Sequence, residues 1–148
     1  MSYQEKRAII FLICNLLSVG LYSLYLFNRY HDTILSTPND FSFWGKSFLI
    51  FIPVSITVCI IIFIVFSIIN KIVTNEDIPV ITDELDRLIE LKSIRISHWI
   101  FILGFLLAMG SQAIGMQPWV MFITLVASGF VASCVAEITK IYLYRKGV

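Results

Sequence analysis

The sequence predicts an all-α protein, an integral membrane bundle of four transmembrane helices that forms a single domain over residues 1–148. Two observations predict this fold. The chain is 58% hydrophobic and only 14% charged, whereas a soluble domain is roughly 45–50% apolar and about 25% charged. Its apolar residues also gather into four long stretches, and about 20 such residues cross a bilayer as one helix. Four crossings would use most of the 148 residues, which excludes a large catalytic domain outside the membrane.

The first predicted span covers residues 8–28, with Lys6 and Arg7 before it and Arg29 after it. This stretch makes about 31 Å of helix, close to the roughly 30 Å of a bilayer core. A secretory signal peptide also begins with positive charge, but its apolar core is shorter and ends at small residues. Because residues 24–27 are large and apolar, we expect an uncleaved span.

The second predicted span covers residues 47–70, which carry no charge. Its many β-branched residues would favour strands in water. Hydrocarbon instead requires every backbone polar group to be hydrogen-bonded within its own segment, so a helix is expected. Pro53 lies in the first turns of this helix and can kink it.

The third and fourth predicted spans, residues 98–116 and 119–143, are separated only by Gln117 and Pro118. So short a connection forces the two helices into an antiparallel hairpin at one face of the membrane. Small residues also align on both spans, which lets two backbones approach closely. The aligned residues are Gly104, Ala108, Ser111 and Gly115, with Gln112 at the edge, and Gly129, Ser133, Ala136, Glu137 and Lys140. We therefore expect these two helices to pack tightly.

Basic residues are distributed unequally between the two sides that four spans define. The side with both termini and the segment between the second and third spans carries nine of them, and the other side carries Arg29 and Lys46. The nine are Lys6, Arg7, Lys71, Arg87, Lys92, Arg95, Lys140, Arg145 and Lys146. Because basic residues favour the cytoplasmic side, we expect a multi-pass protein of the cell membrane with both termini in the cytoplasm and residues 30–46 outside.

Residues 83–97, just before the third span, are predicted to form an amphipathic cytoplasmic helix. Thr82 is a suitable N-cap, and acidic residues in the first turns suit the positive end of the helix dipole. At 100° per residue, one face is apolar and the opposite face is charged. The apolar face contains Ile81, Leu85, Leu88, Ile89 and Ile96. We expect the third helix to begin near Asp83 and to project into the cytoplasm by about 14 residues, roughly 21 Å.

Two interpretations of this apolar face remain open. It can pack on the inner ends of the other helices or on lipid headgroups, or Leu85, Leu88 and Ile89 can bind a protein partner as a helix in a groove. Several acidic residues lie around it, namely Glu76, Asp77, Asp83, Glu84, Asp86 and Glu90. Because their spacing is not that of a metal-binding loop, we expect a solvated face and no metal.

The segment at residues 83–95, DELDRLIELKSIR, resembles a group of small prokaryotic four-helix membrane proteins. In that group a D-E-x-[DE]-R-x-I-x-x-K-x-x-R-like segment precedes the third span. The resemblance covers the second half of the chain and depends on this one motif. Some members of the group are encoded beside small helix-turn-helix regulators, which implies a sensing or regulatory membrane partner. The group has no assigned activity, so the resemblance implies no catalytic residue.

Four polar residues within the spans are further candidates for function, namely Asn15, Gln112, Glu137 and Lys140. An ionisable group inside a bilayer is costly and is a functional hypothesis by default. Glu137 and Lys140 are three residues apart and can form an ion pair. This pair either anchors the end of the fourth helix or gives Glu137 a role in proton relay or ligand binding. On the first span, an inward polar face is expected, made of Asn15, Ser18, Tyr22 and Tyr25.

The sequence contains no signature of an enzyme, and neither a catalytic residue nor a cofactor is expected. His31 and His98 fall on opposite sides of the membrane, which excludes a joint haem or metal site. The cysteines lie one per span, without redox spacing, at Cys14, Cys59 and Cys134. The formal net charge of +1 gives no reason to expect a nucleic acid partner.

Two functions remain. One is a regulatory or scaffolding membrane protein that contacts a protein partner through its cytoplasmic helix. The other is a small transporter or channel that uses Glu137. A homo-oligomer is expected for the second function, because four helices rarely enclose a solute path.

Overall fold

The computed structural model describes residues 3–36, 40–74 and 84–146, and these residues form four α-helices. The helices are α1 (Tyr3–Ser36), α2 (Phe41–Thr74), α3 (Glu84–Ala113) and α4 (Pro118–Lys146). Each of them is long and apolar enough to cross a membrane. The predicted all-α fold with four such helices is therefore confirmed.

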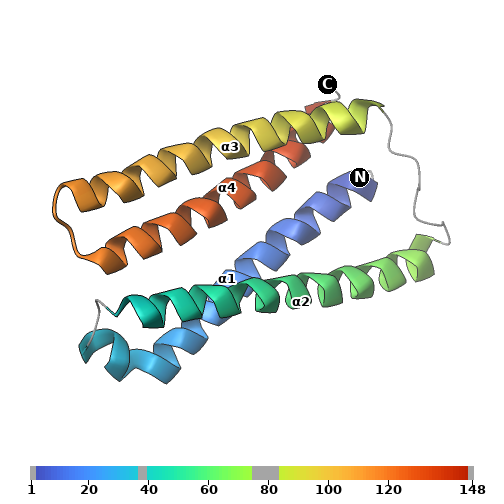
Figure 1. Cartoon of the computed structure of the whole chain (residues 1–148). Helices are drawn as coiled ribbons and strands as arrows, with labels where there is room; N and C mark the ends of the chain where they lie inside the picture. Colours follow the sequence, from blue (N-terminus) through green and yellow to red (C-terminus); the bar gives the residue numbers. More distant parts are fainter. Residues whose placement is uncertain (1–2, 37–39, 75–83, 147–148) are drawn as a thin grey trace.

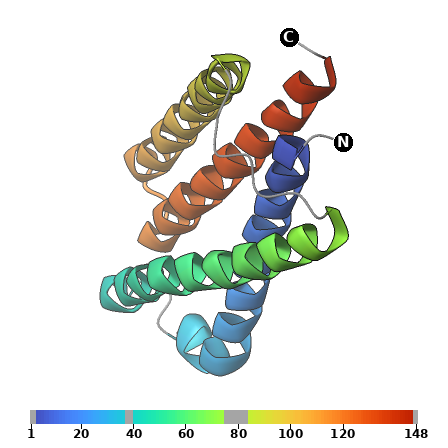
Figure 2. The same ribbon diagram turned by 90° about the vertical axis from the view of Figure 1, so that its right-hand side faces the viewer.

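The order in which the helices pack against one another differs from their order in the sequence. The backbone of α1 packs on both α2 and α4, and α4 packs most extensively on α3 (Figures 1 and 2). Across the described residues, the backbone of α3 adjoins α4 alone. Both termini lie at the same end of the molecule as the first turn of α3 (Figure 1). Charged side chains from three helices therefore meet at this end, which we call the termini end.

The α3–α4 hairpin is held by close contact between small residues, as predicted. A Cβ atom added at Gly104 would lie 2.0 Å from the Cβ of Ser128, so only glycine fits there. Ala108 and Ser111 of α3 and Ala132 of α4 are buried along the same seam. On α4 the contact runs through Ser128 and Ala132, one residue before the predicted Gly129 and Ser133. Helix periodicity identifies the stripe of small residues but leaves its rotation uncertain by about one residue.

A glycine ends α3 and sets up the hairpin turn. Gly115 has a φ of 78°, a conformation that side chains with a Cβ rarely adopt. The amide of Met116 donates to the carbonyl of Ser111, and the amide of Gly115 donates to that of Gln112, at 2.9 and 3.0 Å. This pair of bonds is a Schellman cap. The helix therefore ends at Ala113, before the predicted limit of residue 116.

Helices α1 and α2 extend further than the predicted spans 8–28 and 47–70. The α1 helix continues to Ser36 past a kink at Tyr30 (φ −122°, ψ 21°), and α2 begins at Phe41. The carboxylate of Asp40 accepts the amides of Ser42 and Phe43 at 2.9 and 3.2 Å, which is an N-cap. Most of the predicted loop at residues 30–46 is therefore helical. The α2 helix runs through Pro53 without a break.

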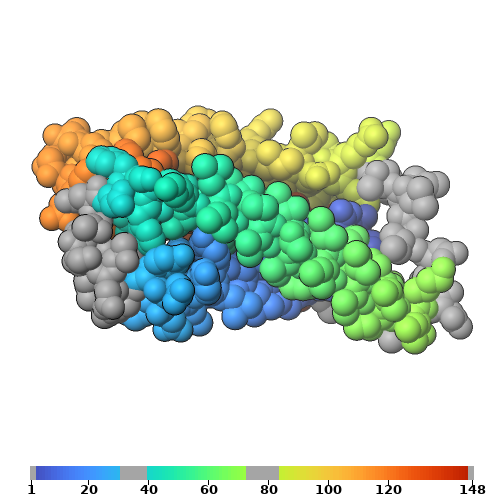
Figure 3. Space-filling view, turned by 60° about the horizontal axis from the view of Figure 1, so that its bottom comes forward, coloured from blue at the N-terminus to red at the C-terminus, as the bar shows by residue number. Residues whose placement is uncertain are grey.

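The α2 helix lies on the surface of the molecule (Figure 3). Many of its large apolar side chains are exposed. Its contact with α1 includes paired aromatic rings. Phe63 stacks on Phe11 with ring centroids 5.8 Å apart, and Phe51 lies 5.0 Å from Tyr22. A water-soluble monomer rarely exposes so continuous an apolar surface.

Candidate functional site

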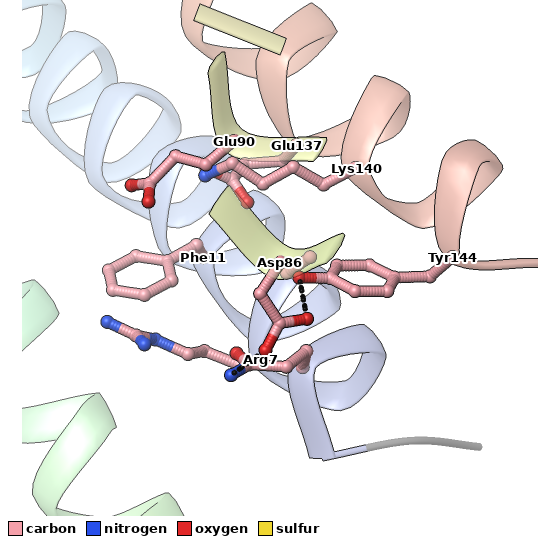
Figure 4. A pocket seen from close by; sticks show the side chains of 9 residues that line it. Arg7, Phe11, Asp86, Glu90, Glu137, Lys140 and Tyr144 are labelled. Atoms are coloured by element: carbon pink, nitrogen blue, oxygen red, sulfur yellow. Dashed lines mark hydrogen bonds and ion pairs between the residues drawn. The ribbon is translucent and has the colours of Figure 1, made fainter. Parts of the chain in front are cut away.

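A cavity of about 320 Å³ lies between α1, α3 and α4 at the termini end (Figure 4). Its wall is rich in ionisable side chains. The lining residues are Gln4, Arg7, Ala8, Phe11, Asp86, Glu90, Glu137, Lys140 and Tyr144. Acidic and basic side chains from three helices line this one cavity, which makes it the candidate site.

Glu137 and Lys140 form the predicted ion pair in this cavity. The Nζ of Lys140 donates to Oε1 of Glu137 at 2.8 Å. Glu137 is only 9% exposed, so its charge is largely shielded from water. Its second oxygen, Oε2, is buried and accepts no hydrogen bond from any of the described residues. The ion pair therefore satisfies one side of the carboxylate and leaves an acceptor on the other.

Asp86 joins the three helices at the outer part of the cavity. Its Oδ1 accepts the hydroxyl of Tyr144 at 3.0 Å, and its Oδ2 accepts the amide of Gln4 at 3.3 Å (Figure 4). The sequence places Asp86 on a charged face and predicts solvent around it. Nothing in the local pattern indicates that α4 and α1 would supply donors, because those donors come from distant parts of the chain.

Two arginines also connect the helices near this end. The guanidinium of Arg7 lies over the rings of Phe11 and Phe63, 5.6 and 5.5 Å from their centroids, a cation–π arrangement that joins α1 to α2. The Nε of Arg145 donates to Oε1 of the buried Glu5 at 2.6 Å. This second ion pair joins α4 to the first turn of α1.

The remaining polar candidates lie outside the cavity. Asn15 donates from Nδ2 to the Oγ of Ser133 at 2.8 Å, so it joins α1 to α4 further along the bundle. Gln112 lies near the opposite end of α3, and its Nε2 has no hydrogen-bond partner among the described residues. Of the predicted polar face of α1, Ser18 is buried, whereas Tyr25 is exposed. The four predicted intramembrane polar residues therefore do not form one site.

The three residues predicted to bind a protein partner point in different directions. Ile89 is 2% exposed and packs inside the bundle, whereas Leu85 and Leu88 are 40% and 55% exposed. Successive residues on a helix differ by 100°, so Leu88 and Ile89 can lie on either side of the line where α3 meets its neighbours. Only Leu85 and Leu88 are accessible to a partner while Ile89 keeps this packing.

The acidic residues near α3 are only partly described. Glu76, Asp77 and Asp83 lie outside the described residues, as do the predicted cap Thr82 and Ile81 of the apolar face. Within residues 3–36, 40–74 and 84–146, no three His, Cys, Asp or Glu side chains are grouped closely enough to hold a metal ion.

Comparison with protein-family models, with curated proteins and with solved structures finds no match to this chain. The resemblance of residues 83–95 to small prokaryotic four-helix membrane proteins therefore stays a prediction.

Proposed function

We propose that the chain is a multi-pass protein of the cell membrane that acts as a regulatory or scaffolding partner of another protein. In this proposal both termini and the first turns of α3 lie in the cytoplasm. Four helices of sufficient length and apolarity support the membrane location, and the nine basic residues on the side of the termini support the orientation.

The observation that carries the proposal is the exposed apolar side of the first turns of α3. Leu85 and Leu88 are both exposed and lie about 60° apart on the helix. These turns also carry five exposed charged residues, Glu84, Arg87, Glu90, Lys92 and Arg95, and so many charges do not suit hydrocarbon. Apolar side chains exposed on a charged helix beside a membrane are typical of a helix that binds in a groove of another protein.

Substitution of both leucines tests this proposal. The variant Leu85→Asp with Leu88→Asp places charge on the proposed contact, while Arg87→Asp introduces the same residue type in the same turn without removing an apolar side chain. We expect cross-linking from a photoreactive residue at position 92, beside this surface, to a protein partner in cells. That cross-link should be lost in the leucine variant and kept in Arg87→Asp. Equal cross-linking in both variants would exclude the helix as the contact.

A second candidate function is a small oligomeric transporter or channel, and the buried Glu137 is the observation that favours it. A carboxylate with one unpartnered oxygen in a polar cavity could exchange a proton or a cation. In proteoliposomes, a transporter of this kind should show cation flux coupled to a proton gradient, and Glu137→Gln should abolish it. Glu84→Gln, which removes an acid outside the cavity, is the matched control. A flux equal in both variants would remove Glu137 from the mechanism.

A further inference from the structure

A groove of about 530 Å³ lies between α3 and α4, near the termini end. It shares no lining residue with the cavity around Glu137. Its lining includes Lys92, Arg95 and Ile96 of α3 and Ile138, Tyr142 and Leu143 of α4. The two basic side chains are the only charged ones among the described residues that line it. The groove is therefore apolar, with two positive charges at its side.

No acidic side chain in the described part of the chain neutralises these two charges. Lys92 and Arg95 are exposed, and neither forms an ion pair or a hydrogen bond with any described residue. They are three residues apart on one helix, a spacing at which like charges repel. The positions three and four residues before and after each of them hold no acidic residue. An anionic group bound between the two side chains would relieve this repulsion.

Aromatic residues indicate where the groove lies relative to a bilayer. Tyr142 lines the groove and is exposed, and Trp99, one turn beyond Arg95, is exposed as well. Tyrosine and tryptophan are enriched at the level of lipid headgroups. Lys92 and Arg95 lie within two turns of residue 98, where the predicted third span begins. Long basic side chains in such positions place their charges at the interface.

We propose that this groove binds an anionic phospholipid, whose phosphate pairs with Lys92 and Arg95 and whose acyl chain covers Ile96 and Ile138. Both isoleucines are exposed. Ile96 follows Arg95 toward the α3–α4 turn, and Ile138 lies one turn from Tyr142 in the same direction, so the apolar surface continues from the charges into the predicted spans. Basic pockets between transmembrane helices bind anionic headgroups in this way.

The apolar surface also separates a lipid from an acidic segment of another protein, which would match the charges alone. The inference rests on the membrane location proposed above, and it does not require the protein partner. Leu88 lies one turn before Lys92, further from the predicted span. A lipid in the groove therefore leaves the proposed protein contact at Leu85 and Leu88 accessible.

Competition between two lipids tests the proposal. The full chain is reconstituted in nanodiscs of phosphatidylglycerol and phosphatidylcholine in equal amounts, with identical acyl chains. Native mass spectrometry of the chain released from the discs then measures each retained lipid. We expect retained phosphatidylglycerol to exceed phosphatidylcholine at least about five-fold.

Two double variants locate the site. Lys92→Gln with Arg95→Gln should bring the two retained lipids to equal amounts. Arg87→Gln with Lys146→Gln, which removes two exposed basic residues outside the groove, should keep the preference. The same preference in both variants would overturn the proposal, as would equal retention of both lipids by the unmodified chain. The contrast between the lipids needs no variant, so it holds even if the first variant fails to fold.

The same experiment separates failure of the lipid site from failure of the proposed function. A chain that does not enter the discs would reject the membrane location on which both depend. A chain that enters them without a lipid preference would reject the lipid site alone, because the discs contain no other protein.

A photoreactive residue at position 142, in the groove, identifies the occupant in cells. We expect the cross-linked chain to gain the mass of an anionic phospholipid. A cross-link from this position to another protein would assign the groove to that protein and overturn the proposal.

Discussion

At the scale of single residues, the cavity shows how side chains that are distant in sequence create a site that no local pattern contains. Asp86 of α3 is held by Tyr144 of α4 and by Gln4 of α1. Asp86 therefore does more than favour the start of a helix through its charge. It also fixes how three helices meet at the termini end.

The hydrogen bond from Tyr144 to Asp86 gives the first prediction. Tyr144→Phe removes this donor and keeps the ring, so the free energy of unfolding should fall by about 1 kcal/mol. Tyr142→Phe is the matched control, because Tyr142 is exposed two residues earlier on the same helix. Unfolding in mixed detergent micelles, followed by circular dichroism, measures both variants. If the two variants are equally stable, the bond to Asp86 contributes nothing to the junction.

At the scale of helices, the fit between α3 and α4 depends on the absence of a side chain at Gly104. The second prediction is that Gly104→Ala destabilises the hairpin by about 1–3 kcal/mol, since overpacking a close contact costs that much. A Cβ there would lie 2.0 Å from the Cβ of Ser128, so the clash involves atoms fixed to the two backbones. The free energy of unfolding in detergent measures the loss.

Two further variants separate the clash from a general effect of alanine. Gly110 lies on the same helix, and nothing is within 4 Å of a Cβ added there. The Gly110→Ala variant should therefore be as stable as the unmodified chain. Adding Ser128→Gly to Gly104→Ala removes the Cβ atom of residue 128 with which the new side chain clashes. The double variant should therefore regain part of the lost stability. A Gly104→Ala variant as stable as Gly110→Ala would mean that the helices are further apart than described.

The sequence predicts the existence of the four helices better than it predicts their ends and faces. Long apolar stretches require helices, and the small residues around Gly104 correctly indicate where α3 meets α4. The start of α2 was missed because the signal is a single side chain, Asp40, that caps two amides. The sequence left open whether Ile89 packs inside the bundle or binds a partner, because periodicity shows which residues share a face and does not show which neighbour covers it.

The candidate site was predictable only in part, for the same physical reason. The pairing of Glu137 with Lys140 follows from their spacing on one helix, and the structure confirms it. The contributions of Arg7 and Asp86 to the same cavity depend on how α1 and α3 lie against α4. That arrangement is set by the packing of distant helices, which a single sequence does not reveal.

At the scale of the whole molecule, the arrangement of the helices agrees with a membrane protein whose polar end faces one compartment. The termini end gathers the charged side chains of α1, α3 and α4, whereas the α3–α4 turn at the other end contains no charged residue between Ser111 and Trp119. An asymmetric distribution of this kind, with basic residues at one end, sets the orientation of a polytopic protein. The proposed topology therefore specifies the side of the membrane on which each terminus and each turn lies.

The last prediction tests that topology. Epitope tags at both termini should be protected from antibody in sealed cells, and a tag inserted at Met116, in the α3–α4 turn, should be accessible from outside. After permeabilisation all three tags should be accessible, which controls for their exposure. A terminal tag that is accessible in sealed cells would reverse the orientation, because four crossings put both termini on the same side. It would also place the exposed leucines of α3 outside the cell, and the proposed cytoplasmic partner would then be excluded.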